Sequence, residues 1–210
     1  MSVVAREGIP HISIPSFLAV ILLLMGYPVG GVAAGIVAVA VALFFRDPER
    51  AHSAVPGDIL SPADGRIVAV DRVQEDRHLG GKALRISVFM SIFNVHVNRV
   101  CMDARVVTVK HVPGGFAMAH LDDAGLINER TEILLVDSSG RKSLMVQVAG
   151  LVARRIICRL REGDDVVRGS RFGLICFGSR VDLYLPEEAQ PLAKIGDRVR
   201  AGQSVLAQMK

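Results

Sequence analysis

Tryptophan and paired cysteines are missing from this sequence, and tyrosine is rare. The 210 residues include no Trp and two Tyr, and the three cysteines, Cys101, Cys158 and Cys176, form no C-x-x-C pair. Each cysteine stands among apolar neighbours, which predicts buried free thiols and favours a reducing compartment. The histidines lack ligand spacing with cysteines or carboxylates, so no metal site is expected.

Aromatic residues also fail to interleave with the basic ones. The net charge is +4 and the basic residues are scattered along the chain. A nucleic-acid partner is therefore not expected. A mild positive charge instead suits attraction to an anionic membrane surface.

Charge is absent from one long stretch, Ile12 to Phe45. A continuous helix of that length would span about 51 Å, far more than a bilayer core of roughly 30 Å. Gly26-Tyr27-Pro28 offers a break in the middle. The sequence therefore predicts two helices, near Pro15–Met25 and Gly30–Phe45.

We expect this helical hairpin, residues 1–45, to attach the chain to a membrane. The first helix is too short to cross easily, so a hairpin dipping into one leaflet and two thin, tilted spans both fit. A cleaved signal peptide is disfavoured because the apolar region is long and has no clear A-x-A site. Arg6 before the hairpin and Arg46 and Arg50 after it favour the cytoplasmic side for both ends. A buried soluble hairpin is the alternative.

Residues 46–210 change to short runs rich in Val and Ile, punctuated by Gly, Pro, Asp and Asn. This pattern is typical of strands. The predicted strands are Arg66–Val73, Leu84–Phe93, Ala104–Lys110, Glu132–Val136, Ser143–Val148, Leu151–Leu160, Phe172–Phe177, Arg180–Leu185 and Ser204–Gln208. Only Ala119–Glu129 suggests a short helix. A mainly β body is therefore predicted.

One internal repeat occurs within this body. Gly163–Gly169 and Gly196–Gly202 both read G-D-x-V-x-x-G and precede an apolar run. Gly-Asp starts a turn, Val points inward, and the second Gly permits a tight reversal. The pattern resembles the hairpins of biotinyl and lipoyl carrier domains, which predicts a barrel-sandwich of that type. Neither repeat has the Lys that a carrier presents, so the repeat indicates a scaffold.

The dipeptide Gly178-Ser179 is the candidate for self-cleavage. Between two apolar runs, a Gly-Ser pair is by itself more often a plain connection. Glycine nevertheless permits a strained backbone in which its carbonyl faces the next hydroxyl, and attack by the Ser179 oxygen would turn the amide into an ester. Removal of the Ser179 α-proton would then leave one chain ending at Gly178 and another beginning with a pyruvoyl group.

Such an attack needs a base, because a serine hydroxyl is a poor nucleophile. His96, within Phe93–Arg99, is the best candidate, although a lone histidine in a strand-like stretch is more often structural. Asp64, within Ser61–Gly65, would orient and charge-balance the imidazole. Pro-x-Asp-Gly is equally a common turn.

Taken together, the segments resemble the phosphatidylserine decarboxylase family, in particular its short prokaryotic branch. The resemblance runs from about Phe44 to the C-terminus. Several ordered motifs carry it, and their order at compatible spacing is more specific than any one of them. These motifs are Phe44–Pro48, Ser61–Gly65, Ser91–Val100, Val112–Phe116, Asn128–Arg130 and Phe177–Val181.

The resemblance implies a pyruvoyl-dependent enzyme that converts phosphatidylserine to phosphatidylethanolamine after cleavage between residues 178 and 179. It implies that Asp64, His96 and Ser179 perform the processing, with Ser179 becoming the covalent pyruvoyl cofactor. Chains 1–178 and 179–210 would stay together non-covalently, in a homo-oligomer on the cytoplasmic face of the bacterial inner membrane. Arg46 and Arg50, most simply interface anchors, are candidates to meet the lipid phosphate.

One departure from the family concerns His96. Longer relatives carry two histidines three residues apart in this motif, and Arg99 occupies the second position here. The sequence therefore leaves open whether His96 serves both cleavage and decarboxylation or whether His111 or His120 assists. Two other functions also remain open: a membrane-anchored lipoyl-like structural adaptor, and decarboxylation of an archaeal-type ether phosphatidylserine.

Overall fold

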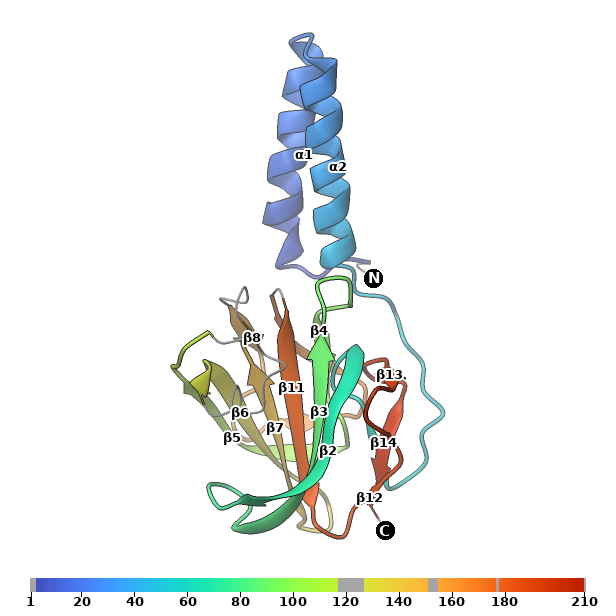
Figure 1. Ribbon diagram of the computed structural model, residues 1–210, viewed down its shortest axis with the longest axis vertical. Coiled ribbons are helices and arrows are strands. Elements are labelled where there is room, and N and C mark those ends of the chain that lie inside the picture. Colours follow the sequence, from blue (N-terminus) through green and yellow to red (C-terminus); the bar gives the residue numbers. More distant parts are fainter. Residues whose placement is uncertain (1–2, 117–126, 151–154, 177, 210) are drawn as a thin grey trace. The chain divides into compact units, whose positions relative to one another are not determined.

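The computed structural model describes residues 3–116, 127–150, 155–176 and 178–209. The chain divides into two units, Met1–Glu49 and Arg50–Lys210. The first unit contains the helices α1 (Gly8–Leu24) and α2 (Pro28–Phe44), and the second is rich in β-strands (Figure 1). Each unit is described separately below.

The two helices form an antiparallel hairpin (Figure 1). α2 begins at Pro28, which suits the first turn because a proline there lacks only an amide hydrogen that the helix does not use. A side chain at Gly31 would place its Cβ 2.5 Å from Leu23 Cγ, so the close approach of the helices requires glycine at this position. The predicted start of α1 at Pro15 is wrong: the helix begins at Gly8 and contains Pro15. Packing against α2 outweighs the local cost of that proline.

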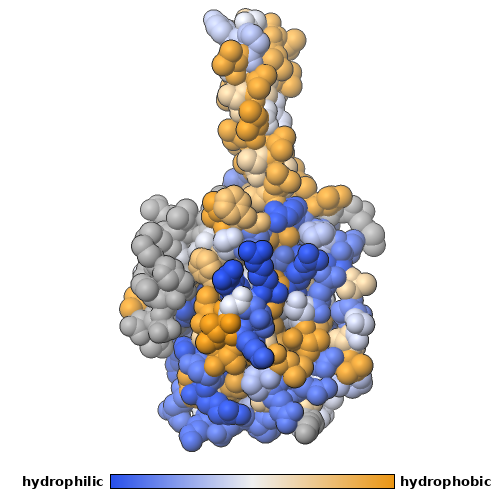
Figure 2. Space-filling view, turned by 45° about the vertical axis from the view of Figure 1, so that its right-hand side comes forward, coloured by the Kyte–Doolittle hydropathy of each residue, from blue (hydrophilic) through white to orange (hydrophobic). Residues whose placement is uncertain are grey.

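The helical unit exposes an apolar surface. Figure 2 shows it largely in the hydrophobic colour, and Phe17 is 70% and Val29 83% exposed. An apolar surface of this extent marks an interaction site rather than the outside of a soluble hairpin. Each helix has 17 residues. Among the residues that the structure describes, no helix has the length and apolar character needed to cross a membrane.

The second unit is mainly β, as predicted. An antiparallel sheet of eight strands, in the order β13-β2-β3-β11-β7-β6-β5-β9, curls into a half-barrel, and two three-stranded sheets, β1-β14-β12 and β4-β10-β8, accompany it (Figure 1). The strands are β1 (Asp58–Leu60), β2 (Gly65–Glu75), β3 (Gly81–Met90), β4 (Val97–Arg99), β5 (Ala104–Val112), β6 (Arg130–Val136), β7 (Lys142–Val148), β8 (Ile156–Cys158), β9 (Asp165–Val166), β10 (Arg171–Ile175), β11 (Ser179–Pro186), β12 (Gln190–Pro191), β13 (Arg198–Val199) and β14 (Val205–Gln208).

Two of the predicted strands differ most clearly in extent from the observed ones. The strand predicted to reach Phe93 ends at Met90, because the Asn94 side chain accepts hydrogen bonds from the amide and hydroxyl of Ser91, each at 2.8 Å, and makes a turn. In the predicted strand Leu151–Leu160 only β8 is extended, and residues 151–154 lie outside the described residues. The helix predicted at 119–129 also lies largely outside them.

The core lies on one face of the curled sheet. Along β11, Val181, Leu183 and Leu185 are buried in it, and the alternate residues point to the other face. Cys101 is also buried there, and burial raises the pKa of its thiol to about 12. Cys158 and Cys176 are only half-buried, so the prediction of three buried thiols is wrong for these two.

The G-D-x-V-x-x-G repeats form the two edges of the large sheet. The first contains β9, which pairs with β5, and the second contains β13, which pairs with β2. The four terminal glycines of the repeats all adopt positive φ, which confirms the predicted turns; they are Gly163 (90°), Gly169 (79°), Gly196 (95°) and Gly202 (69°). The repeats therefore serve as scaffold at both edges.

The hydrogen bonds around the two repeats are equivalent. Gly196-Asp197 exchanges two backbone hydrogen bonds with Ile67, both at 2.9 Å, and Gly163-Asp164 does the same with Val106, at 2.9 and 2.8 Å. Ile67 and Val106 occupy corresponding positions of one pattern, D-x-R-x-V-x-V, in residues 64–70 and 103–109. The β-rich unit thus contains an approximate internal duplication, of which sequence analysis recognised only the G-D segments.

Candidate active site

Asp64, His96 and Ser179 each lie where a strand begins. Asp64 directly precedes β2, His96 directly precedes β4, and Ser179 is the first residue of β11. Ser179 pairs with Met90 at the end of β3, and Arg66 on β2 pairs with Phe89. Asp64 and Ser179 therefore lie at the same end of three neighbouring strands, β2, β3 and β11.

A buried polar contact ties β4 to this end of β11. The Asn98 amide contacts Met90 Sδ at 3.6 Å and accepts a hydrogen bond from Gln147 at 2.8 Å. Met90 is the ladder partner of Ser179, and Gln147 is the partner of Val181. The Asn98 side chain on β4 therefore contacts both strands that flank the first residues of β11.

His96 enters the same region through β4. It lies two residues before Asn98, so their side chains share one side of the extended chain. The His96 carbonyl accepts a hydrogen bond from the Ile175 amide at 3.4 Å, at the end of β10 and shortly before Ser179. His96 is 2% exposed. The structure thus gathers the three predicted residues at one end of the β-rich unit.

Ser179 has the features of a protected nucleophile. It is completely buried, and its Oγ has no hydrogen-bond partner among the described residues. A buried unpaired hydroxyl is costly and calls for an explanation. Gly178 has φ +60°, and a Cβ there would meet nothing within 4 Å. Glycine is therefore needed for the backbone conformation and not for space, and these residues fit the formation of a serine-derived group.

Asp64 is held by Arg50. The guanidinium binds both carboxylate oxygens, with Nη2 2.8 Å from Oδ2, and it also donates to the Ala201 carbonyl at 2.7 Å. The Ala201 amide donates to Asp64 Oδ1 at 2.8 Å. The Arg50 side chain is 6% exposed, so it is engaged inside the unit and does not meet a lipid phosphate, contrary to one expectation from the sequence.

The internal duplication supplies a counterpart to Asp64. Asp103 Oδ1 accepts a hydrogen bond from the Arg168 amide at 2.8 Å, just as Asp64 accepts one from Ala201. Both carboxylates therefore hold a repeat in place. Asp64 differs in being buried and in lying at the end of the sheet where β11, with Ser179, begins.

Arg99 has a structural contact at the position where longer relatives carry a second histidine. It is 4% exposed and donates to the Gly169 carbonyl at 3.0 Å. Its Cδ lies 2.7 Å from where a Cβ of Gly202 would be. Arg99 thus joins the final glycines of the two repeats.

The two histidines considered as assistants do not join this group. His111 lies on β5, near Thr131 Oγ1 at 3.4 Å and Glu129 at 3.8 Å, and β7 and β6 separate β5 from β11 in the sheet. His120 lies outside the described residues. Within the described ranges, no group of three or more His, Cys, Asp or Glu side chains is arranged to hold a metal ion.

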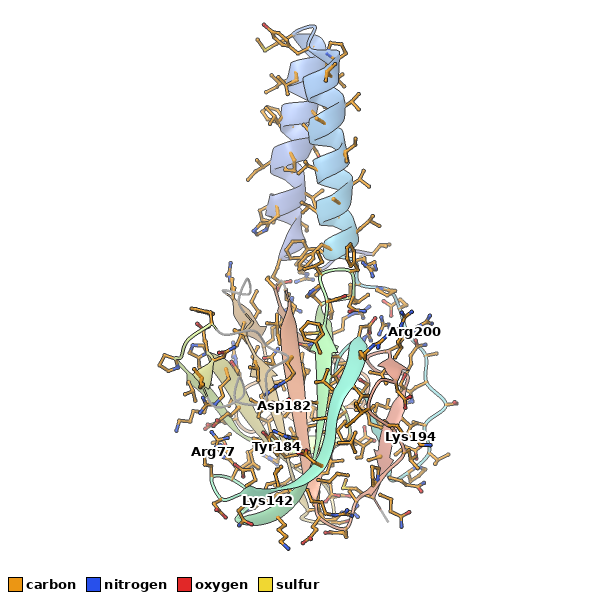
Figure 3. All side chains as sticks on the ribbon, viewed as in Figure 1. Arg77, Lys142, Asp182, Tyr184, Lys194 and Arg200 are labelled. Atoms are coloured by element: carbon orange, nitrogen blue, oxygen red, sulfur yellow. The ribbon has the colours of Figure 1, made fainter. Side chains whose placement is uncertain are left out.

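An ion pair occupies the other face of β11. Arg180 Nε lies 2.8 Å from Asp182 Oδ1, and a second contact joins Nη2 to Oδ2 at 3.0 Å. Burial, together with the charge of Asp182, raises the pKa of Tyr184 to about 12. Figure 3 shows Asp182 and Tyr184 on β11, with Arg77 of the β2–β3 hairpin beside them. These contacts fix β11 directly after the proposed cleavage site.

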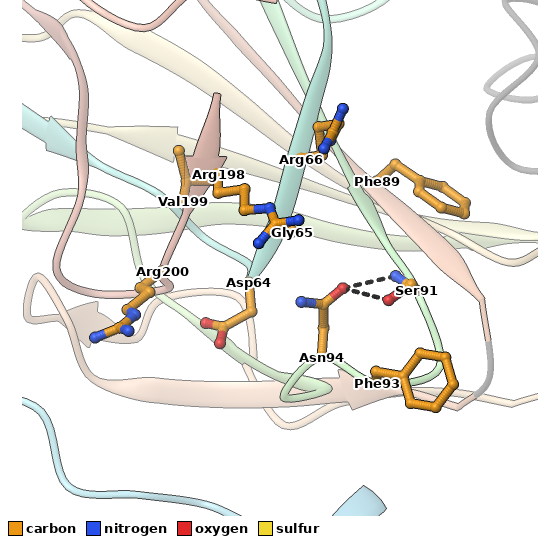
Figure 4. A pocket seen from close by; sticks show the side chains of 10 residues that line it. All are labelled: Asp64, Gly65, Arg66, Phe89, Ser91, Phe93, Asn94, Arg198, Val199 and Arg200. Carbon is orange, nitrogen blue, oxygen red and sulfur yellow. Dashed lines mark hydrogen bonds between the residues drawn. The ribbon is translucent and has the colours of Figure 1, made fainter. Parts of the chain in front are cut away.

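A cavity of about 700 Å³ opens beside the start of β2 (Figure 4). Asp64, Ser91 and Asn94 line it together with three arginines, Arg66, Arg198 and Arg200. No sequence motif marks these arginines as a group, because only the pairing of β13 with β2 brings them together.

The chain is similar to known proteins along nearly its whole length. The family model described as phosphatidylserine decarboxylase matches residues 37–207. A phosphatidylserine decarboxylase proenzyme of Cupriavidus metallidurans is 45% identical over 207 residues, covering 98% of this chain and 95% of that protein. The proenzyme of Nitrosomonas eutropha is 45% identical over 208 residues, with 99% and 96% covered. That of Symbiobacterium thermophilum is 44% identical over 207 residues, also with 99% and 96% covered.

Proposed function

Because the chain belongs to the phosphatidylserine decarboxylase family, we propose that Ser179 is the residue it converts into its pyruvoyl group, with His96 and Asp64 assisting. The chain is a decarboxylase proenzyme that converts phosphatidylserine to phosphatidylethanolamine, and it is membrane-associated. Proenzymes of this family carry a pyruvoyl group derived from serine. The observation that carries the assignment is the buried, unpaired Ser179 Oγ next to Gly178 at φ +60°.

Self-cleavage begins with attack of Ser179 Oγ on the Gly178 carbonyl carbon. His96 accepts the hydroxyl proton and passes it to the amine that is released when the peptide C–N bond breaks, which leaves an ester. Loss of the Ser179 α-proton then expels the Gly178 carboxylate, and water enters as ammonia leaves. Asp64 orients His96 in this scheme, while Arg50 balances its charge.

In decarboxylation the same residues act on the lipid headgroup. The pyruvoyl group supplies an electron sink for the carbanion left by loss of CO2. His96 holds the proton that is returned to the substrate carbon. Its burial, with that of Ser179, keeps bulk water from the reacting carbon.

The mature enzyme consists of chains 1–178 and 179–210 held together without a covalent link. Support comes from β11, which lies between β3 and β7 and which the small chain contributes. The equivalent repeats support a barrel-sandwich of the lipoyl type. The hairpin, residues 1–45, attaches residues 46–210 to the cytoplasmic face of the bacterial inner membrane, in a homo-oligomer. Since the family consists of decarboxylase proenzymes, the adaptor alternative falls away.

A denaturing gel with intact mass spectrometry tests this assignment. From 178 of 210 residues and 22.6 kDa, the purified protein should show pieces of about 19 and 3 kDa, the smaller beginning with a pyruvoyl group. Ser179→Ala should stay uncleaved and inactive. Ser143→Ala removes another buried Oγ without a partner among the described residues, and it should cleave normally. Active wild-type protein that stays intact would refute the assignment.

A further inference from the structure

Three arginines without local partners line the cavity beside the start of β2. Arg66 lies on β2, Arg198 on β13, and Arg200 just beyond it (Figure 4). Among the described residues, none of these three side chains forms a hydrogen bond or an ion pair. The carboxylate that lines the same cavity, Asp64, is already bound by Arg50. The cavity therefore carries an uncompensated positive charge.

Two of these arginines face each other directly. Arg66 and Arg198 are opposite residues on the paired strands β2 and β13. Like charges in such positions destabilise a sheet. At the equivalent position of the duplicated half, Arg105 on β5 is opposite Asp165 on β9. The fold therefore permits an oppositely charged pair at this position, yet the half that lines the cavity has two arginines there. An anion between them would offset the repulsion.

The place of the cavity identifies that anion. Arg66 pairs with Phe89, the neighbour of Met90, and Met90 is the ladder partner of Ser179, so the cavity lies at the end of the sheet where β11 begins. Ser91 and Asn94 also line the cavity (Figure 4), and their segment continues to His96 two residues later. In phosphatidylserine a few bonds separate the phosphate from the amine and carboxylate that react. Arginine is also the side chain best suited to bind phosphate oxygens in pairs.

We propose that this cavity is the phosphodiester subsite of the decarboxylase, with Arg66 and Arg198 binding the phosphate oxygens and Arg200 adding to the positive field. Phe93, which is 80% exposed at the edge of the cavity, contacts the glycerol side of the lipid. The inference rests on the proposed function, because Ser179 defines where the headgroup must reach.

The decisive experiment measures kinetics on monomeric, water-soluble short-chain phosphatidylserine. Arg66→Gln combined with Arg198→Gln should raise KM by about tenfold or more, the scale of one or more lost charge-assisted hydrogen bonds, with kcat changed less than about twofold. Arg105→Gln is the matched control, since it removes an exposed arginine at the equivalent position of the other half, and its KM should not change. Inorganic phosphate should compete with substrate in the wild type, and roughly tenfold less strongly in the double variant.

A second variant separates binding from folding. Arg198→Asp restores the charge arrangement of the other half, so it should raise the thermal unfolding midpoint while it raises KM. Each variant should cleave completely on a denaturing gel, which shows that its change in KM does not arise from impaired processing. Failure of the wild type to cleave would instead refute the proposed function. A KM that is unchanged in the double variant would overturn the subsite. So would a KM that rises only on anionic vesicles, since the arginines would then merely attract the membrane surface.

Discussion

Asp64 and Asp103 show how one residue type takes two roles in a duplicated fold. Each accepts a backbone hydrogen bond at 2.8 Å from a repeat, from Ala201 and Arg168 respectively. Only Asp64 is also buried, bound by Arg50 and placed at the end of the sheet where β11 begins. The backbone hydrogen bond holds a repeat in place and is common to both aspartates. Burial and the ion pair with Arg50 distinguish Asp64 from Asp103.

We therefore expect the matched variants Asp64→Asn and Asp103→Asn to differ in processing. Asparagine retains an oxygen for the backbone hydrogen bond in both. Asp64→Asn should slow self-cleavage roughly a hundredfold or more, the scale of an impaired general base. It should also lower the unfolding midpoint, because Arg50 stays buried without its carboxylate. Asp103→Asn should cleave at the wild-type rate.

The measurement is a gel time course of newly made protein, at a temperature well below both unfolding midpoints. If Asp64 served only to hold its repeat, both variants would cleave alike, and the proposed role in orienting His96 would be wrong.

At the scale of elements, the β2–β3 hairpin folds over the outer face of the sheet. The Glu132 carboxylate on β6 accepts hydrogen bonds from Arg77 Nη1 and His78 Nε2 at the hairpin tip, each at 2.8 Å. It also accepts one from Arg130 Nε at 2.7 Å. Burial alone would raise the pKa of Glu132, but the hydrogen bonds from Arg130 and His78 and the charge of Arg77 outweigh it and hold the pKa below its usual value. The Glu132 carboxylate thus links the β2–β3 hairpin to β6.

This lowered pKa predicts an acid-dependent part of the stability. Since the unfolded chain binds the Glu132 proton more tightly than the folded one, the stabilisation is complete above the unfolded value of about 4.3 and is lost as pH falls through the lower folded value. Thermal unfolding midpoints between pH 7 and pH 3 should fall less steeply for Glu132→Gln than for the wild type. Glu188→Gln, at an exposed position, should keep the wild-type slope. Equal slopes for all three proteins would contradict the prediction.

The longer strands could be predicted from the sequence, and the short ones could not. Along β11 the alternation of Val181, Leu183 and Leu185 with polar residues signals a strand by itself. Two-residue strands such as β9 and β13 are too short to show an alternation of apolar and polar residues. Only their pairing with β5 and β2 defines them. The predicted start of α1 at Pro15 is wrong because packing against α2 lets the helix continue through that proline.

At the scale of the whole molecule, only part of the proposed site could be predicted from the sequence. Ser179, His96 and Asp64 are candidates because ordered motifs resemble a known family. The pair Arg66 and Arg198 did not, since their juxtaposition depends on strand register between segments far apart in the chain. The shared pattern D-x-R-x-V-x-V was visible in the sequence, and it would have revealed the duplication before the structure did.

The position of the proposed small chain, 179–210, leads to a prediction about the mature enzyme. Its strand β11 lies between β3 and β7, and β13 and β14 pair with β2 and β1. Full burial of Val181, Leu183 and Leu185 contributes roughly 1.5–3 kcal/mol each. The small chain should therefore stay bound after cleavage and separate only when the fold is lost.

Asp182→Asn tests how firmly that chain is held. Arg180 and Asp182 both belong to the proposed small chain and are buried on the outer face of β11, so the variant removes the carboxylate from a buried ion pair, at a cost of about 3 kcal/mol or more. With an affinity tag after Lys210, native pull-down should recover the large chain from cleaved wild-type protein. The urea concentration that releases it should fall clearly for Asp182→Asn. Glu187→Gln, exposed just after β11, should match the wild type. Loss of the large chain in native buffer would mean that β11 leaves the sheet once Gly178-Ser179 is cut, and a non-covalent pair could not then be the mature enzyme.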